Sequence, residues 1–228
     1  MAQQLAVQQL QQQQQQQQRH HQQFTNLEKS DRLHTNATVQ DFLEVYEVGE
    51  TVGVGGFAVV KKGRDKRTGE PVAIKVVDKS RYSAGDNSLE REIQVLLQVD
   101  HPNCIKLENV YITPRKVYLV TELVTGGELL DRVTEKGNYS EEDARRLIKQ
   151  ILNGVAYLHS HGIVHRDLKL ENMILQNERD DSPVKIADFG VSLSGWRQGF
   201  WWSAINFEWA YGKILCLCFE CTAFAGHF

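Results

Sequence analysis

The sequence predicts an α+β protein, with a small sheet lobe followed by a helical lobe. Runs of β-branched residues separated by turn-rich stretches fill residues 45–124, a pattern typical of hairpins. Apolar residues at helical spacing begin soon after residue 140. Strands with one helix therefore come first and helices come later, which is the order expected of an α+β fold.

Two hairpins are expected in the sheet lobe. The first joins the run 52–60 to the run 72–77 through the turn-rich stretch 67–71. The second joins residues 105–112 to residues 116–123. Together they provide the strands of a small sheet.

Two helices are predicted from apolar spacing. The first follows Asn87 and Ser88, which can cap it, and its apolar face holds Leu89, Ile93, Leu96 and Leu97. The second begins at Ser140, with Asp143 placed as in a capping box. Its apolar face holds Ala144, Leu147, Ile148, Ile151, Leu152, Val155 and Leu158.

The two ends of the chain differ from this central region. Residues 1–40 contain an unbroken glutamine run at 11–18 and bury too little apolar surface to offset ordering, so we expect a disordered tail. Residues 195–228 hold all four tryptophans without a clear period, so we expect a separate aromatic and cysteine-rich tail. A folded domain is expected at 45–194.

Composition argues against several classes of protein. The formal charge of the 228 residues is −3, so no basic field attracts nucleic acid or a membrane surface. No apolar run is long enough to span a bilayer, and the N-terminus lacks the apolar segment of a secretory signal. The four cysteines form no disulfide framework, which favours a cytosolic or nuclear protein. A zinc site at Cys216, Cys218 and Cys221 is disfavoured by their irregular spacing.

A glycine-rich stretch covers residues 53–60. Glycines at a turn let backbone N–H groups approach phosphate oxygens without interference from side chains. The flanking residues are β-branched, so the loop joins two strands and does not lead into a helix as a dinucleotide-binding loop does. An ordinary glycine-rich hairpin is the alternative interpretation.

Lys75 stands among apolar strand residues, where a charge is costly to bury without a partner. Glu92, on the first predicted helix, is the natural partner. A lysine held in this way presents a fixed positive charge to phosphate oxygens. The alternative is that both side chains are solvated.

Two further motifs carry acidic and amide side chains, at residues 165–172 and 185–190. Phosphoryl transfer from ATP requires an orienting carboxylate, a cation near the transferred phosphate, and metal ligands. Asp167 and Lys169 can supply the first two. Asn172 and Asp188 are hard oxygen ligands suited to Mg²⁺.

Taken in order, the glycine loop, Lys75, the 165–172 motif and the Asp-Phe-Gly motif at 188–190 resemble the signature set of protein kinases over about 150 residues. The resemblance implies a two-lobed kinase-like fold with an N-lobe at 45–124 and a partial C-lobe at 125–194. It also implies ATP and Mg²⁺ as cofactors and transfer of the γ-phosphate to protein hydroxyls.

By resemblance, Lys75 contacts the α- and β-phosphates and pairs with Glu92, Asp167 accepts the hydroxyl proton, and Lys169 steadies the γ-phosphate. Asn172 and Asp188 hold Mg²⁺. The implied ATP-binding set is Val52, Gly53, Val54, Gly55, Gly56, Val60, Ala73, Lys75, Thr121, Glu122, Val124 and Ile174, with Thr121 as gatekeeper. The resemblance also implies that Leu96, Leu107, His165 and Phe189 stack into a column between the lobes.

Residues 126–131 resemble the calcium/calmodulin-dependent kinase group, and Lys169 the serine/threonine class. Protein substrates with a serine or threonine, and a basic residue upstream that Glu128 and Glu171 recognise, are the implied partners. A solvated acid at a helix start is the alternative for Glu128. Calmodulin dependence does not follow from these residues. Ala58 departs from the third glycine of the family's loop, a mild change.

After residue 194 the sequence shares nothing recognisable with the family. We therefore expect a truncated kinase that lacks the activation segment and later helices. Apolar residues of the second helix would then stay exposed, forfeiting roughly 1.5–3 kcal/mol each. The alternative function is a catalytically dead fragment that binds nucleotide or partners.

Overall fold

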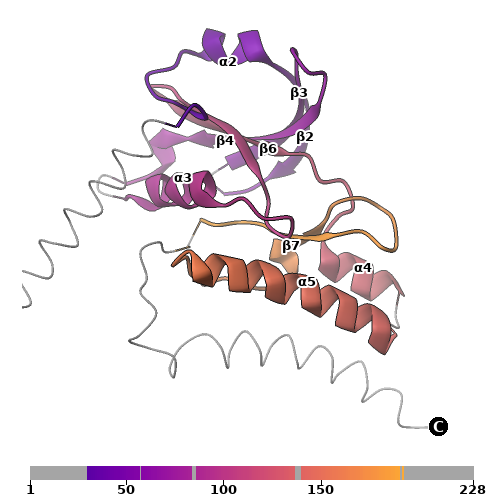
Figure 1. The fold of residues 1–228 in the computed structure, drawn as a ribbon. Coiled ribbons are helices and arrows are strands. Elements are labelled where there is room, and N and C mark those ends of the chain that lie inside the picture. The colour runs from indigo at the N-terminus through magenta and orange to yellow at the C-terminus, as the bar shows by residue number, and fades with distance from the viewer. Residues whose placement is uncertain (1–29, 57, 84–85, 137–139, 191, 193–228) are drawn as a thin grey trace, which may run out of the picture.

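A computed structural model describes residues 30–56, 58–83, 86–136, 140–190 and 192 (Figure 1). A sheet with helix α3 forms one part, and helices α4 and α5 with a small two-stranded sheet form the other. The two-lobed α+β prediction is confirmed. None of the helices in the described ranges is long and apolar enough to cross a lipid bilayer.

The larger sheet has six strands in the order β1-β5-β6-β4-β3-β2. All neighbours are antiparallel except β1 and β5, which are parallel. Both predicted hairpins are present, as β3–β4 and β5–β6, but the predicted run 52–60 covers the end of β2, the glycine turn and only the start of β3. The strands are β1 (Leu33–His34), β2 (Tyr46–Val54), β3 (Ala58–Asp65), β4 (Pro71–Asp78), β5 (Leu107–Ile112) and β6 (Lys116–Glu122).

Strand β4 lies in the middle of this sheet and sets the position of the site. Ile74 is fully buried, whereas Ala73 and Lys75 point to the opposite face because side chains alternate along a strand. In the strand register, Lys75 pairs with Val60 and Ala73 pairs with Thr121. Residues from three strands therefore share one patch of the sheet.

Helix α3 (Ser88–Gln98) packs one apolar face against the sheet and buries Ile93, Val95 and Leu96, among others. The short η1 helix (Lys79–Arg81) precedes it. The predicted cap is wrong in its details. Asn87 occupies the N-cap position, but its side chain makes no capping hydrogen bond to the described residues of the helix. The Asp86 carboxylate instead accepts from the Ser88 N–H at 2.9 Å.

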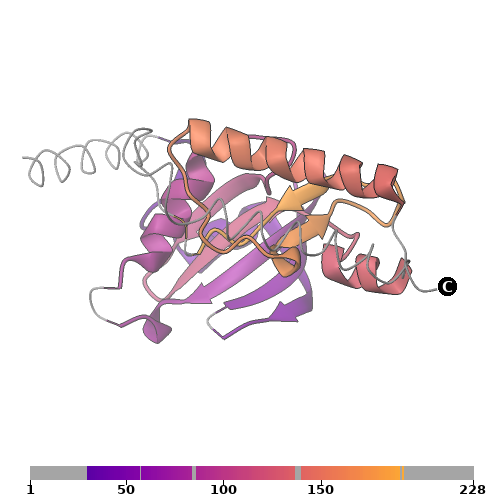
Figure 2. The same cartoon turned by 90° about the horizontal axis from the view of Figure 1, so that it is seen from below.

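The helical part contains α4 (Leu129–Lys136), α5 (Glu141–Ser160), the short η2 helix (Leu170–Asn172), β7 (Met173–Leu175) and β8 (Val184–Ile186). Seen from below, α5 runs beside the small sheet and packs against β8 (Figure 2). Ser140 caps α5 by accepting from the Asp143 N–H at 3.1 Å, but the Asp143 carboxylate accepts from the Ser140 hydroxyl and so does not complete the predicted capping box. Apart from Ile151 and Leu158, the apolar residues predicted for its inner face are half-buried.

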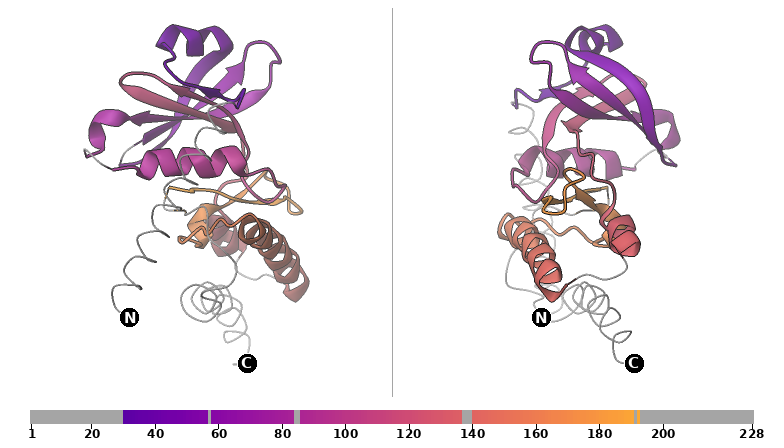
Figure 3. Two further views of the ribbon diagram at one scale, coloured as in Figure 1. Left: turned by 60° about the vertical axis from the view of Figure 1, so that its left-hand side comes forward. Right: turned by 90° about the vertical axis from the view of Figure 1, so that its right-hand side faces the viewer.

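The predicted disordered tail at 1–40 is too long at its C-terminal end. Residues 30–40 belong to the fold, because β1 hydrogen-bonds along β5, Ala37 is buried, and Thr38 caps helix α2 (Val39–Val45) in a capping box with Asp41. The two views in Figure 3 show α2 at the far end of the sheet from α5. The glutamine run and the tail at 195–228, with its cysteine cluster, lie outside the described residues.

Candidate functional site

The Lys75 ammonium and the Glu92 carboxylate form an ion pair of 2.6 Å between β4 and α3. The Glu92 side chain is 7% exposed and that of Lys75 is 32% exposed. Burial alone would lower the pKa of Lys75, but the charge and hydrogen bond of Glu92, with the charge of Asp188, raise it. Lys75 is thus a fixed cation, as the sequence predicts.

The loop at 165–172 brings Asp167, Lys169 and Asn172 together. The Lys169 ammonium lies 2.9 Å from the Asp167 carboxylate, and the Asn172 amide donates to that carboxylate at 3.0 Å. These bonds, that from Lys169 foremost, outweigh partial burial and hold the pKa of Asp167 below its ordinary value. Asp167 is therefore an anion whose position is fixed from two sides.

His165 connects this loop to the segment after β8 that carries Asp188. Its Nε2–H donates to the Ala187 carbonyl at 2.9 Å, and its Nδ1 accepts from the Asp167 N–H at 3.3 Å. Burial is the main cause that lowers the pKa of His165, which keeps the imidazole neutral. The Ala187 N–H in turn donates to the Asn172 carbonyl at 2.9 Å. The two predicted metal ligands thus sit on loops that are bonded to each other.

Asp188 is exposed and has a positive φ of 60°. Arg166, in the other loop, has a φ of 69°. Such backbone conformations cost free energy for residues other than glycine, and they persist where surrounding contacts fix them. The hydrogen bond to Asp167 is the main cause that raises the pKa of Lys169, and the charge of Asp188 adds a smaller contribution to it.

The four side chains predicted to stack between the lobes are all buried. Leu96, Leu107, His165 and Phe189 are 4%, 0%, 2% and 1% exposed. The rings of His165 and Phe189 lie 5.1 Å apart between centroids. Leu96, Leu107 and Phe189 also belong to one buried apolar cluster, which contains residues of both lobes.

The glycine-rich loop is the turn between β2 and β3. The Gly55 N–H donates to the Ala58 carbonyl at 2.8 Å, and residue 57 lies outside the described ranges. A methyl group placed on Gly56 would meet no described atom within 4 Å. Val52 and Val54 are 49% and 78% exposed. The described residues therefore leave space at Gly56 for an external group such as the phosphates of a nucleotide.

The predicted adenine-binding residues lie at and just after the end of β6, on β3 and β4, and on β7. Thr121 pairs with Ala73, while Val60 pairs with Lys75. Val60, Ala73, Val124 and Ile174 are all half-buried. Ile174 lies on β7 in the helical part, so the predicted set draws on both lobes.

A buried ion pair that the sequence analysis did not predict connects the end of β6 to β8. The Lys185 ammonium donates to the Glu122 carboxylate at 2.9 Å, and their side chains are 9% and 20% exposed. The same carboxylate accepts from the Lys106 N–H at 2.8 Å. The signal was present, because Lys185 stands in an apolar strand as Lys75 does. The pair ties the end of β6 to the strand that leads to Asp188.

The residues present fit Mg²⁺ bound with a nucleotide. The Asn172 amide nitrogen donates to Asp167, so its amide oxygen would be one ligating atom, and the Asp188 carboxylate would supply the second. Among the described residues no group of three or more His, Cys, Asp and Glu gathers as a metal site. Two oxygen donors completed by phosphate oxygens are the arrangement that Mg²⁺ commonly adopts in nucleotide sites.

Comparison with known proteins agrees with this geometry. Residues 46–201 match the protein kinase domain family. Myosin light chain kinase A of Dictyostelium discoideum is 48% identical over 150 residues, which cover 65% of this chain and 51% of the relative. Human calcium/calmodulin-dependent protein kinase type IV is 49% identical over 149 residues, covering 65% and 31%. Human calcium/calmodulin-dependent protein kinase type 1B is 44% identical over 153 residues, covering 67% and 45%.

These matches confirm the resemblance to the calcium/calmodulin-dependent group that residues 126–131 indicated. The chain spans between about a third and half of the length of these relatives.

Proposed function

Because the chain belongs to the protein kinase family, we propose that it transfers the γ-phosphate of ATP to serine and threonine hydroxyls of protein substrates. The observation that carries this proposal is the Asp167 carboxylate, which Lys169 holds at 2.9 Å and the Asn172 amide holds at 3.0 Å. An oriented carboxylate for the hydroxyl with a cation beside it is what phosphoryl transfer requires.

Each residue of the site has a part that its contacts support. Mg²⁺-ATP, when bound, supplies the phosphoryl group and neutralises charge on it. Lys75 holds the α- and β-phosphates, and Asn172 and Asp188 hold the metal. Asp167 stays ionised and orients the substrate hydroxyl. Lys169 lies 2.9 Å from the Asp167 carboxylate and stabilises the negative charge that develops on the transferred phosphate.

The substrate class rests on two exposed acids. Glu128 precedes α4 and Glu171 lies in η2, and both are exposed. We propose that they recognise a basic residue upstream of the target hydroxyl. The charge reversals Glu128→Lys and Glu171→Lys should then each raise the KM for a basic peptide and leave the KM for ATP unchanged.

A second candidate function is nucleotide or partner binding without transfer. The half-buried apolar residues of α5, such as Leu147 and Val155, favour it, because the described residues leave that face partly uncovered. In that case the site binds nucleotide but presents no platform for a substrate.

A transfer assay separates the two candidates. The full chain is incubated with radiolabelled ATP, Mg²⁺ and a basic protein substrate, beside an Asp167→Asn variant. Incorporation by the wild type at least about a hundredfold above the variant, the low end of what a positioned base contributes, supports transfer. Equal signals from the two proteins would reject it and leave the binding function.

A further inference from the structure

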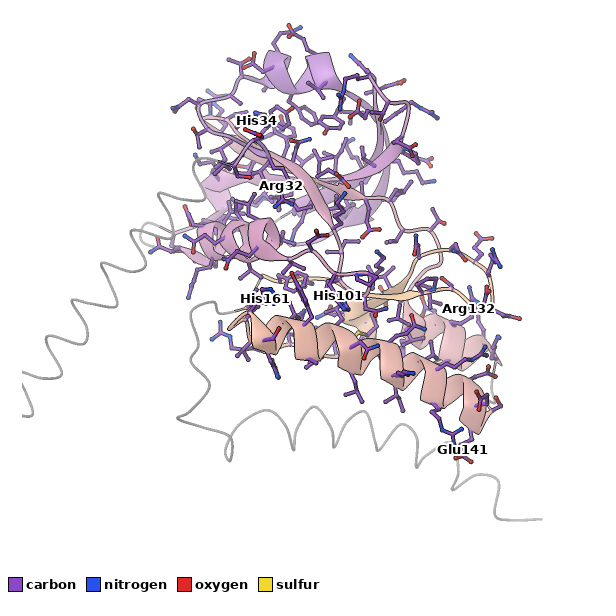
Figure 4. All side chains as sticks on the ribbon, in the orientation of Figure 1. Arg32, His34, His101, Arg132, Glu141 and His161 are labelled. Atoms are coloured by element: carbon purple, nitrogen blue, oxygen red, sulfur yellow. The ribbon has the colours of Figure 1, made fainter. Side chains whose placement is uncertain are left out.

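The segment 30–38, which precedes α2, lies along the edge of the sheet beside α3. Figure 4 shows Arg32 between His34 and α3. We propose that this segment, called here the clamp segment, positions α3 through Arg32 and so holds Glu92 against Lys75. The inference rests on the proposed function, since it assigns a positioning residue to the same site.

Backbone hydrogen bonds attach the clamp segment to β5. The Val110 N–H donates to the Arg32 carbonyl at 2.8 Å, and the Ala37 N–H donates to the Ile112 carbonyl at 3.1 Å. Leu33 packs against the core that contains the α3 leucines. The segment is thus fixed to the sheet independently of its contact with α3.

The Arg32 guanidinium joins α3 to β5. One nitrogen donates to the Leu97 carbonyl at 2.5 Å and the other donates to the Leu107 carbonyl at 3.1 Å. Leu97 lies in the last turn of α3, where carbonyls have no partner within the helix. A cation at this end also interacts favourably with the helix dipole. The Arg32 side chain therefore supplies a hydrogen-bond donor to one carbonyl at the end of α3 and connects that end to the first residue of β5.

The clamp segment affects Glu92, which it does not contact through Arg32, because α3 moves as a rigid helix. Glu92 is five residues before Leu97, which is about 7.5 Å along the axis. The Asn87 side chain does not cap the other end within the described residues. Tyr157 adds a weaker restraint by donating to the Gln98 carbonyl at 3.4 Å. Restraint at the Leu97 end therefore fixes the position of Glu92 relative to Lys75.

His34 provides a second contact of the clamp segment. Its ring stacks on Tyr111 with centroids 4.3 Å apart, and it hydrogen-bonds to Asn109 at 3.3 Å. These contacts keep β1 paired when Arg32 is changed. Substitution of Arg32 should therefore release α3 without unfolding the edge of the sheet.

The test compares Arg32→Ala with Arg64→Ala in the full chain. Arg64 is the matched control, because it also donates to a backbone carbonyl, that of Gly69 at 2.8 Å, in a turn distant in sequence from α3. Arg32→Ala should lower kcat/KM for ATP about tenfold, equivalent to about 1.4 kcal/mol, and speed amide exchange over residues 91–98. Arg64→Ala should change neither. Arg32→Lys should recover part of the loss, because lysine keeps the charge but not the planar fork.

A double-mutant cycle excludes a merely structural role. In a Glu92→Gln background, Arg32→Ala should lower kcat/KM no further if Arg32 acts through Glu92. Effects that add, or α3 exchange equal to that of the wild type, would overturn the inference. If the wild type transfers no phosphate, the proposed function fails on its own, and amide exchange of α3 still decides whether Arg32 holds the helix.

Discussion

At the scale of single residues, the buried neutral His165 couples stability to pH. Its folded pKa is lowered, mainly by burial, whereas the unfolded imidazole keeps a pKa near 6.5. Below that value the unfolded state binds more protons, so the free energy of unfolding should fall as the pH drops from 7.5 to 5.5. Urea denaturation across this range measures the fall.

Two other histidines contribute to the same fall, so the difference between the wild type and His165→Gln isolates the part that belongs to His165. His101 and His159 also have pKa values lowered by burial, so they act in the same direction. Asp143 and Asp167 have lowered pKa values, and they matter only near and below 3.8. His165→Gln should weaken the pH dependence. A free energy that stays constant or rises toward pH 5.5 would show that His165 is not held neutral.

Gly126, just after the proposed adenine-binding segment, has no room for a side chain. An added Cβ would lie 2.6 Å from the Leu175 Cβ and closer still to the Asn177 carbonyl oxygen. Because backbone must move, Gly126→Ala should destabilise the protein by about 2–3 kcal/mol. Gly56→Ala is the control, since its methyl group meets no described atom within 4 Å. Similar denaturation midpoints for the two variants would contradict the packing around Gly126.

At the scale of elements, Ser140 is expected to stabilise α5 through its cap. Its hydroxyl accepts from the Asp143 N–H, so Ser140→Ala should cost about 1 kcal/mol. Asn87→Ala, at the N-cap of α3, should cost much less because that side chain makes no capping bond to the described helix. Chemical denaturation of the two variants tests the difference, and a larger loss from Asn87→Ala would reverse the assignment.

The contrast between these caps shows what the sequence can and cannot predict. Both positions carry residues that favour N-caps, yet only Ser140 has the extended backbone, with φ −64° and ψ 152°, that aims its hydroxyl into the helix. Asn87 has φ −99° and ψ 21°. Residue type predicts where each helix begins. Whether the capping hydrogen bond forms depends on the backbone conformation of the N-cap residue, which the neighbouring turn sets.

The strands also differ in how far they could be predicted from the sequence. The hairpins β3–β4 and β5–β6 were predictable because their turns and β-branched runs are local in sequence. Strand β1 was missed because two residues pair in parallel with β5, more than seventy residues away. At the site, the Lys75–Glu92 pair followed from the cost of an unpaired charge, and the Glu122–Lys185 pair could have been found by the same argument.

At the scale of the whole molecule, the proposed nucleotide site draws on both lobes, since Lys75 lies on β4 of the larger sheet, Asn172 ends η2 before β7, and Asp188 follows β8. A ligand that binds such a site stabilises the folded chain by RT ln(1 + [L]/Kd), about 2.7 kcal/mol at a hundredfold excess over Kd. Mg²⁺-ATP should therefore raise the melting temperature by several degrees.

Three variants make the thermal test specific. Lys75→Met should abolish the rise, whereas Lys62→Met should keep it, because Lys62 pairs with Glu50 on an exposed surface of the sheet. Asp167→Asn should also keep it, since Asp167 orients the hydroxyl and does not hold the nucleotide. An equal rise for Lys75→Met and Lys62→Met would mean that the nucleotide binds elsewhere. Loss of the rise in Asp167→Asn would mean that Asp167 takes part in binding, and its role as a separate orienting group would have to be abandoned.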